Sequence, residues 1–279
     1  MKEFSGKVVV VTGAASGIGR EIALAFARRG ARLVIGDING DGLRAVGEEL
    51  EALGTEFFAE VVDVSQAWQM EEFCETTYKR MGRVDVLCNN AGIGLGGAFE
   101  DLTLDDLKLV MGVNLWGVIH GCHFFYPRMI EQGGGGHIVN TSSGAALAPI
   151  PMLTAYTCTK CGVLGLSEDL RGEAALHGIG VTALCPGIIS TNIMKTTGIR
   201  ARTSRWSEDE SRGKLKWLME KRGLLPSKVA EKVVRGVERN KGVVRVGPET
   251  YLIDIVHRVS RHLNDSILKF SYWFIKRWF

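Results

Sequence analysis

The chain has few of the features that would place a protein outside the ordinary globular class. Its 279 residues include only 6 prolines and 6 cysteines, and its formal net charge is +3 at pH 7. Hydrophobic residues make up 46% and charged residues 23%, a balance that argues against intrinsic disorder. Because so small a net charge gives no general attraction to nucleic acid, we expect no nucleic-acid partner.

Long apolar runs are also missing. No hydrophobic stretch approaches the roughly 20 residues that a membrane-spanning helix needs. Residues 1–7 lead directly into an apolar segment, without the charged and apolar regions of a secretory signal. We therefore expect a cytoplasmic protein.

The cysteines do not have the distribution of a disulfide framework. All six lie inside expected helices and strands, which suits buried thiols in a reducing compartment. Cys158 and Cys161 have the spacing of a redox or metal-binding pair, but no second pair accompanies them and their surroundings are helical. A structural role is therefore favoured, and we expect no metal site.

What the sequence does contain is a strand, a glycine-rich turn and a helix near its start. Residues 7–12 form an apolar, β-branched run, typical of a strand buried on both faces. The turn Gly13–Gly19 follows, and residues 21–28 have helical periodicity. Such a turn lets the backbone approach a pyrophosphate at the helix amino terminus. Asp37 follows about 20 residues later, where a carboxylate binds ribose hydroxyls and repels a 2′-phosphate. This pattern predicts NAD in preference to NADP.

Strands and helices alternate along the remaining chain. Further strands are expected at about 31–36, 56–62, 84–88, 137–141, 181–185 and 243–246. Helices are expected at about 42–53, 66–81, 104–114, onward to 131, from 156 to 177, and at 227–240. The pattern predicts an α/β, Rossmann-type doubly wound parallel sheet of about seven strands with helices on both faces. Residues 1–279 are most simply divided as a single domain.

Tyr156 and Lys160 are four residues apart in an expected helix, so their side chains share one face. An ammonium beside a phenol favours ionisation and lowers the phenol's pKa from about 10. The pair therefore predicts an acid/base group that works near neutral pH.

Over about residues 6 to 192, the motifs resemble those of the short-chain dehydrogenase/reductase family. The matching pieces are Thr12-Gly13-x-x-x-Gly17-x-Gly19, Asp63, Asn89-Asn90-Ala91-Gly92, Asn114, Ser143, Tyr156-x-x-x-Lys160, and Pro186-Gly187 with Thr191. They occur in the family's order and near its spacing. Short-chain enzymes are NAD(P)-dependent oxidoreductases, so the resemblance implies hydride transfer between an alcohol and a ketone, and a homodimer or homotetramer.

The resemblance also implies roles for individual residues. Tyr156 would exchange a proton with the substrate oxygen, Lys160 would lower the tyrosine's pKa and hold the nicotinamide ribose, and Ser143 would orient the same oxygen. Ser142 is an alternative, but the family's separation from the tyrosine fits Ser143. Asn114 would anchor a water that connects Lys160 to solvent, or would only kink its helix. The implied cofactor residues are Gly13, Ser16, Gly17, Ile18, Gly19, Asp37, Asp63, Val64, Asn90, Ala91, Gly92, Tyr156, Lys160, Pro186, Gly187, Ile189 and Thr191.

The segment of about residues 190–225 differs in character. It mixes arginines with acidic residues and carries Trp206 and Trp217, which suits a mobile lid over the substrate. The expected pocket lining is apolar: Ala145, Ala146, Leu147, Leu153, Ile188 and Met194. An apolar lining predicts a lipophilic secondary alcohol or ketone. An NADPH-dependent carbonyl reductase and a non-catalytic dinucleotide sensor are the alternatives.

The extension 249–279 has apolar residues three or four apart, accompanied by basic and aromatic side chains. A helix of this kind docks on the protein's own body or on another subunit, or lies on a membrane surface. Docking is the favoured interpretation, and peripheral membrane contact remains the alternative.

Overall fold

The computed structural model describes residues 1, 3–190, 197–201, 207–259, 265–270 and 272–273. Its strands are β1 (Val8–Thr12), β2 (Arg32–Asp37), β3 (Phe57–Val61), β4 (Val86–Asn89), β5 (Leu95–Gly97), β6 (Gly136–Thr141), β7 (Ile179–Pro186), β8 (Gly198–Arg200) and β9 (Val243–Val246). Its α-helices are α1 (Gly17–Ala27), α2 (Gly40–Ala52), α3 (Ala67–Met81), α4 (Leu104–Met111), α5 (Gly117–Glu131), α6 (Gly144–Leu147), α7 (Thr154–Ala174), α9 (Glu208–Arg222), α10 (Pro226–Glu238) and α11 (Pro248–Val259).

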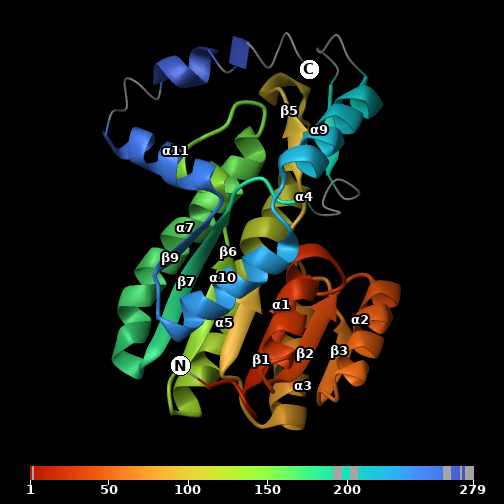
Figure 1. Cartoon of the computed structure of the whole chain (residues 1–279), viewed down its shortest axis with the longest axis vertical. Helices are drawn as coiled ribbons and strands as arrows, with labels where there is room; N and C mark the ends of the chain where they lie inside the picture. The colour runs from red at the N-terminus through yellow and green to blue at the C-terminus, as the bar shows by residue number, and fades with distance from the viewer. Residues whose placement is uncertain (2, 191–196, 202–206, 260–264, 271, 274–279) are drawn as a thin grey trace.

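Seven of these strands form one parallel sheet in the order β3-β2-β1-β4-β6-β7-β9 (Figure 1). The chain moves outward from β1 to β3 and then returns to continue from β4 on the other side. The order therefore reverses between β1 and β4, and ligands bind outside the carboxyl ends of strands at such a point. The predicted doubly wound sheet is confirmed.

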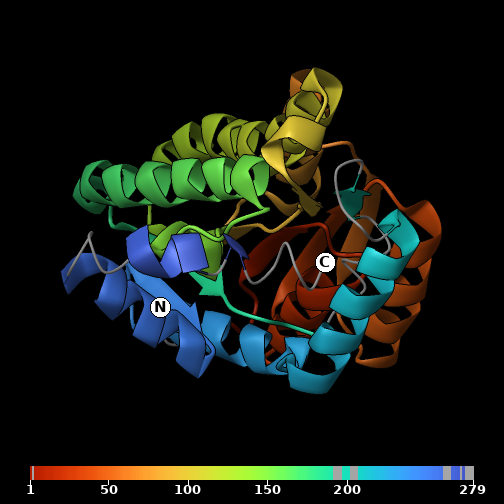
Figure 2. The same cartoon turned by 90° about the horizontal axis from the view of Figure 1, so that it is seen from above.

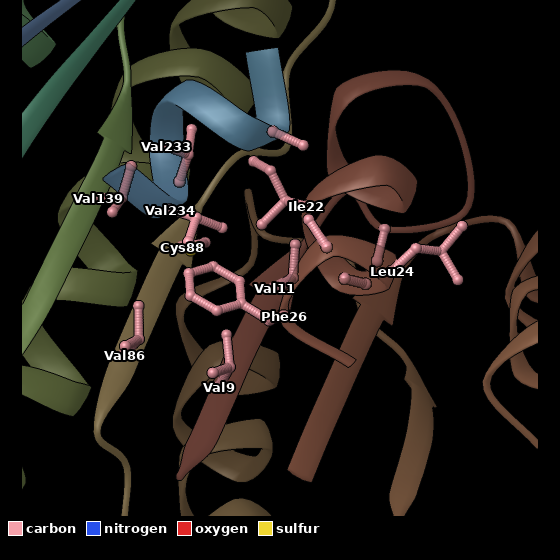
Figure 3. Packing of buried hydrophobic residues seen from close by; sticks show 14 of the residues in the cluster. Val9, Val11, Ile22, Leu24, Phe26, Val86, Cys88, Val139, Val233 and Val234 are labelled. Atoms are coloured by element: carbon pink, nitrogen blue, oxygen red, sulfur yellow. The ribbon is translucent and has the colours of Figure 1, made fainter. Parts of the chain in front are cut away.

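The apolar β1 run divides its side chains between two cores. Val9 and Val11 pack with α1, α2 and α10 on one face, where Phe26 is fully buried (Figure 3). Val8 and Val10 pack with α3, α5 and α7 on the other face. Because successive strand residues point to opposite faces, a strand covered on both sides must be apolar at every position. Figure 2 shows this layering from above, with the green α5 and α7 opposite the blue α10.

Two features of the fold differ from the sequence prediction. The helices expected to meet near residue 114 form one continuous run, because a π-helical turn at Gly112–Trp116 joins α4 to α5. Two short strands, β5 and β8, form a separate parallel pair beyond the main sheet. Each has three residues and two of β5 are glycines, so neither has the apolar alternation that reveals a strand.

Helix α11 docks on the protein body, as favoured from the sequence, but through its polar face. Asp254 is buried and pairs with Arg245 of β9 at 2.5 Å, and Thr250 is fully buried. Leu252, Ile255 and Val259, which belong to the apolar residues spaced three or four apart in the extension, are exposed. The buried ion pair and hydroxyl determine how the helix is rotated, so its apolar stripe points outward.

Candidate active site

The carboxyl ends of β1 and β4 are joined at the point where the strand order reverses. The Thr12 hydroxyl accepts hydrogen bonds from the backbone N–H groups of Asn90 and Ala91, at 3.1 and 3.2 Å. The Asn90 side-chain amide donates to the carbonyls of Thr12 and Gly13, at 3.1 and 3.3 Å. Asn90 therefore fixes the start of the glycine turn. This contact is made to the protein and was not expected from the sequence.

The glycine turn leaves room only for backbone. A Cβ on Gly13 would lie 2.6 Å from the Ala91 Cα, and one on Gly19 would lie 2.1 Å from the Gly13 carbonyl oxygen. Gly13 and Gly17 also have positive φ angles of 66° and 56°, which favour glycine. Ser16 precedes α1 in an extended conformation, and its side chain makes no capping hydrogen bond. This cradle and helix terminus fit a dinucleotide pyrophosphate.

Asp37 supports the glycine turn from the end of β2. Its carboxylate accepts hydrogen bonds from the backbone N–H of Ala15 at 3.0 Å and of Asn39 at 2.9 Å. The side chain remains partly exposed beside the turn, where it was expected to meet the adenosine ribose. Removing this carboxylate therefore affects the turn as well as any contact with ribose.

Asp63 and Val64 follow β3 at the same sheet edge. The Asp63 carboxylate accepts hydrogen bonds from the Ser65 backbone N–H and hydroxyl, at 3.0 and 2.7 Å. The Val64 carbonyl lies 2.9 Å from the His120 Nδ1. These bonds hold the residues expected to contact adenine in a defined turn, and His120 is a supporting residue that the motifs did not reveal.

Tyr156 and Lys160 share a face of α7, with the Lys160 Nζ 5.6 Å from the centre of the tyrosine ring. Lys160 is buried, and its ammonium donates to the Thr141 carbonyl oxygen at 2.9 Å. Ser143 lies next to them as the N-cap of α6 and hydrogen-bonds the tyrosine. Ser142 is buried and donates to the Lys160 carbonyl at 2.7 Å. Of the two serines, the geometry favours Ser143 as the partner of Tyr156.

The pKa values of Tyr156 and Lys160 are both shifted, and burial is the largest cause of each shift. Burial raises the pKa of Tyr156, and the hydrogen bond with Ser143 opposes that rise. Burial lowers the pKa of Lys160 to about 8. The lowering of the Tyr156 pKa that was predicted from Lys160 is not found, because removal from water disfavours the charged form of each group.

Asn114 lies in the π-helical turn, and its side chain binds the backbone of Ile93 in the segment that follows β4. Its side chain accepts from the Ile93 N–H at 2.8 Å and donates to the Ile93 carbonyl at 2.9 Å. A Cβ on Gly92 would lie 3.2 Å from the Asn114 Oδ1 and 3.5 Å from the Lys160 Nζ. Asn114 and Lys160 thus meet at Gly92, so the helix distortion and the placement near the lysine occur together.

The segment after β7 is held by its neighbours. Gly187 donates from its N–H to Val246 of β9 at 2.8 Å, and Ser190 donates to the Leu224 carbonyl at 2.9 Å. Pro186 and Ile189 are buried. Thr191 and Met194 lie outside the described residues, as do Arg202, Arg205 and Trp206.

The chain between Ser143 and Tyr156 has an unusual conformation at its centre. Met152 has a φ of 68°, in the left-handed region that non-glycine residues rarely adopt. Its carbonyl accepts from the Gly97 N–H of β5 at 2.8 Å. The β5–β8 pair therefore supports this loop, and strain of this kind is common near functional sites.

The expected apolar lining is distributed over two environments. Ala145 and Leu147 are buried in the protein, whereas Ala146, Leu153 and Ile188 are partly exposed. The partly exposed members are the ones available to a substrate.

The cysteines correct one sequence expectation. All six are free and four are buried, but Cys158 and Cys161 are exposed. Both lie on the outward side of α7, whose inward face is occupied by residues such as Val163. Within the described ranges, no group of three or more metal-ligating His, Cys, Asp or Glu side chains occurs.

Comparison with known proteins identifies the family. Residues 7–201 match the family model for short chain dehydrogenases. The chain belongs to the short-chain dehydrogenase/reductase family. Its Rossmann-type fold is the one these dehydrogenases share, and solved structures similar to it include complexes with NAD and with NADPH.

Individual relatives differ in how much of their length is matched. The chain is 43% identical over 257 residues to EphD of Mycobacterium bovis, named as a probable oxidoreductase; this covers 92% of the chain but only 43% of EphD. It is 37% identical over 184 residues to the 1-deoxy-11-beta-hydroxypentalenate dehydrogenase of Streptomyces avermitilis, covering 65% of the chain and 68% of that protein. A short-chain dehydrogenase/reductase from Burkholderia phymatum, solved with NAD, superposes with a TM-score of 0.86 at 31% identity, covering 92% and 95% of the two chains.

Proposed function

We propose that the protein is an NAD-dependent oxidoreductase that interconverts a lipophilic secondary alcohol and its ketone. The observation that carries this proposal is the arrangement of Ser143, Tyr156 and Lys160 beside the glycine turn. A dinucleotide-binding protein without catalytic activity has no need for a buried lysine beside a tyrosine and a serine. The arrangement therefore favours an enzyme over a dinucleotide sensor.

The residues divide the reaction between them. Bound NAD supplies the hydride acceptor at the nicotinamide ring. Tyr156 takes the hydroxyl proton from the alcohol, or returns it to the ketone in the reverse direction. Ser143 donates a hydrogen bond to the same oxygen, and the Lys160 ammonium stabilises negative charge on the tyrosine oxygen. The proton then passes by way of Lys160 toward Asn114 and solvent.

The remaining residues of the proposed cofactor site bind the dinucleotide and orient it. Gly13, Ser16, Gly17, Ile18 and Gly19 hold the pyrophosphate at the start of α1. Asp37 binds the adenosine ribose and selects NAD, because its carboxylate repels a 2′-phosphate. Asp63, Val64, Asn90, Ala91 and Gly92 form the adenine and ribose side of the site, while Pro186, Gly187, Ile189 and Thr191 form the nicotinamide side.

A lipophilic substrate is supported by the apolar character of the lining predicted from the sequence. Ala146, Leu153 and Ile188 are apolar and partly exposed. The dehydrogenase from S. avermitilis, by its name, acts on a hydroxylated pentalenate. An apolar lining favours a substrate of this general class over a sugar or a small acid.

The proposed domain organisation is one Rossmann-fold dehydrogenase domain over residues 1–279. Residues 190–225 cover the substrate as a lid, and β8 in this segment is tied to α4 by the ion pair between Arg200 and Asp106, at 2.5 Å. Hydrogen bonding from Arg200 holds the pKa of Asp106 below its usual value. Both side chains therefore remain charged at neutral pH, and the ion pair between Arg200 and Asp106 stays formed.

Exposed apolar residues and free thiols support three further assignments: the oligomeric state, a membrane contact and the location in the cell. Phe99, Leu104, Leu109 and Trp116 are each more than half exposed along α4 and its flanks, and a second copy of the chain would cover them in a homodimer or homotetramer. No described helix is long and apolar enough to cross a bilayer. The exposed stripe of α11 within the amphipathic extension 249–279 instead suits peripheral contact with an anionic membrane. Six free thiols suit the cytoplasm.

The test is an NAD-coupled screen of secondary alcohols graded in ring number and chain length. The wild-type protein should turn over apolar alcohols, and Tyr156→Phe should bind NADH normally while losing about 100- to 10,000-fold in kcat. Retained turnover in this variant would falsify the mechanism. Turnover with NADPH but not NADH would replace the proposal with a carbonyl reductase, and NADH binding without any turnover would favour a sensor.

A further inference from the structure

The first turn of α11 carries a carboxylate that the reaction described above does not use. Glu249 is the second residue of this helix, and its side chain points back toward the segment that follows β7. The Glu249 Oε1 accepts a hydrogen bond from the Ile188 backbone N–H at 3.1 Å. This bond joins the C-terminal extension to the middle of segment 186–190.

Two glycines make room for the Glu249 carboxylate. A Cβ on Gly187 would lie 1.8 Å from the Glu249 Oε1, and one on Gly247 would lie 2.2 Å from the same oxygen. Gly247 also has a φ of 109°, which other residues rarely adopt. Both backbone positions that face the carboxylate therefore lack a side chain, and any larger residue there would displace it.

The next residue extends the contact to the catalytic loop. Thr250 is fully buried, and its hydroxyl donates to the Gly247 carbonyl at 2.7 Å. Its methyl group lies 3.2 Å from the place of a Cβ on Gly144 and 3.1 Å from that on Gly187. The first turn of α11 thus packs against the residue after Ser143 and against the segment after β7.

We propose that Glu249 is a positioning residue that fixes segment 186–190 for nicotinamide binding. This inference rests on the proposed function, which assigns that segment to the cofactor. Neighbouring amides of the segment are held by Val246 and Leu224, and Glu249 holds the amide of Ile188 between them. A charged acceptor makes a stronger hydrogen bond than a neutral one, and a carboxylate is favoured in the first turn of a helix.

The variants separate hydrogen bonding from helix stability. Glu249→Ala removes the acceptor, Glu249→Met removes it at similar side-chain volume, and Glu249→Gln retains an acceptor oxygen. Asp105→Ala is the matched control, because Asp105 is also the second residue of its helix, α4, and forms an exposed pair with Lys108. Each variant is examined by amide hydrogen exchange without ligand, by NADH titration and by thermal unfolding.

We expect faster exchange in the peptide containing residues 187–190 and about tenfold weaker NADH binding in Glu249→Ala and Glu249→Met. Glu249→Gln should restore most of both properties, and Asp105→Ala should leave both unchanged. Wild-type exchange and affinity in Glu249→Met would overturn the assignment. A wild-type protein that binds neither NADH nor NADPH would overturn the proposed function itself, whereas unchanged binding in the Glu249 variants would overturn only the positioning role.

Discussion

The carboxyl edge of the main sheet and helix α11 both turn polar side chains inward, but they differ in what they leave exposed on the surface. At the sheet edge, Thr12, Asn90 and Asp37 bind backbone groups of other elements, so polar side chains form the inner framework. In α11, polar Thr250 and Asp254 also face inward, but Leu252 and its apolar neighbours face solvent. The first region is internally complete, whereas the second leaves an apolar surface uncovered.

This difference indicates which property of the protein each region controls. A buried polar group has a cost unless it is hydrogen-bonded, so the network at the sheet edge is specified by its partners. An exposed apolar stripe adds no stability to the folded chain, because apolar groups stabilise a fold only when they are buried. We therefore expect substitutions at the sheet edge to change catalysis and stability, and those on the stripe to change association.

The largest expected effect is at Lys160. Its pKa is lowered from 10.5 to about 8 by burial, so keeping it charged at pH 7 opposes folding. Lys160→Met should therefore abolish most turnover, by about 1000-fold, while stabilising the ligand-free protein by up to about 3 kcal/mol. Chemical unfolding at pH 7 measures the gain.

The pH dependence provides the control for this prediction. The folded-state pKa of Lys160 lies below the unfolded one, so the wild-type penalty is present below about pH 8 and disappears as the pH rises toward 10.5. The advantage of Lys160→Met should shrink across that window. A variant that is less stable than wild type at pH 7 would show that the lysine is not an isolated buried charge.

The next effect concerns Asp37, which both supports the glycine turn and selects the cofactor. Asp37→Asn keeps an acceptor for the Ala15 N–H but removes the charge, whereas Asp37→Ala removes both. Both variants should raise the preference for NADP over NAD on the order of a hundredfold, because repulsion of the 2′-phosphate is lost. Only Asp37→Ala should also weaken NAD binding by about tenfold. The Kd values of each variant for NAD and NADP measure this preference. An unchanged preference in both variants would show that Asp37 does not select the cofactor.

The central strands of the main sheet were predictable because they are buried on both faces and are therefore apolar along almost their whole length. The run at β1 and the site motifs after β4 and before α7 are local in sequence, and parallel topology brings their ends to one edge. The β5–β8 pair escaped prediction because three-residue strands rich in glycine carry no periodicity. Helix boundaries near Gly112 were also missed, since a π-helical turn preserves an apolar pattern while changing its phase.

The residues of the candidate site that belong to a sequence motif could be predicted. The contacts that depend on how distant segments pack could not. Nothing in the sequence indicates that Thr141 supplies the carbonyl for Lys160 or that Glu249 reaches Ile188, because these contacts join distant segments. The pKa direction of Tyr156 was wrong for a related reason. Spacing alone places a lysine nearby, but burial, which depends on the whole fold, determines which effect is larger.

The third prediction concerns how the stability of the protein depends on pH through the buried His137 of β6. His137 of β6 is buried, and its Nε2 lies 2.7 Å from the Thr182 hydroxyl, which donates to the Lys241 carbonyl. Burial, with a smaller contribution from Arg171, lowers the pKa of His137 from 6.5 to about 3. The folded-state pKa is depressed, so its stability contribution is present above pH 6.5 and is lost as the pH falls toward 3. Between pH 7 and 5 the wild type should lose roughly 2 kcal/mol more than His137→Gln. Parallel slopes of unfolding free energy against pH in the two proteins would contradict this.

The smallest expected effect on the fold comes from the α11 stripe. The triple variant Leu252→Ser, Ile255→Ser, Val259→Ser removes apolar groups that are already in water, so its unfolding free energy should stay within about 0.5 kcal/mol of wild type. If the stripe contacts a membrane, the variant should partition about tenfold less onto vesicles that contain phosphatidylglycerol. Co-sedimentation measures the partition.

The control for the stripe removes three exposed apolar residues that are scattered over the surface. Leu53, Trp68 and Leu176 lie on other elements and do not form a stripe, so their serine triple variant should co-sediment as wild type does. Raising the salt concentration should weaken wild-type partition if the basic residues of the extension meet anionic lipid. Equal partition of both triple variants would exclude the stripe as a membrane contact. A shift of only the α11 variant to a smaller assembly in solution would instead assign the stripe to a second copy of the chain, because the same apolar surface would then be covered by protein.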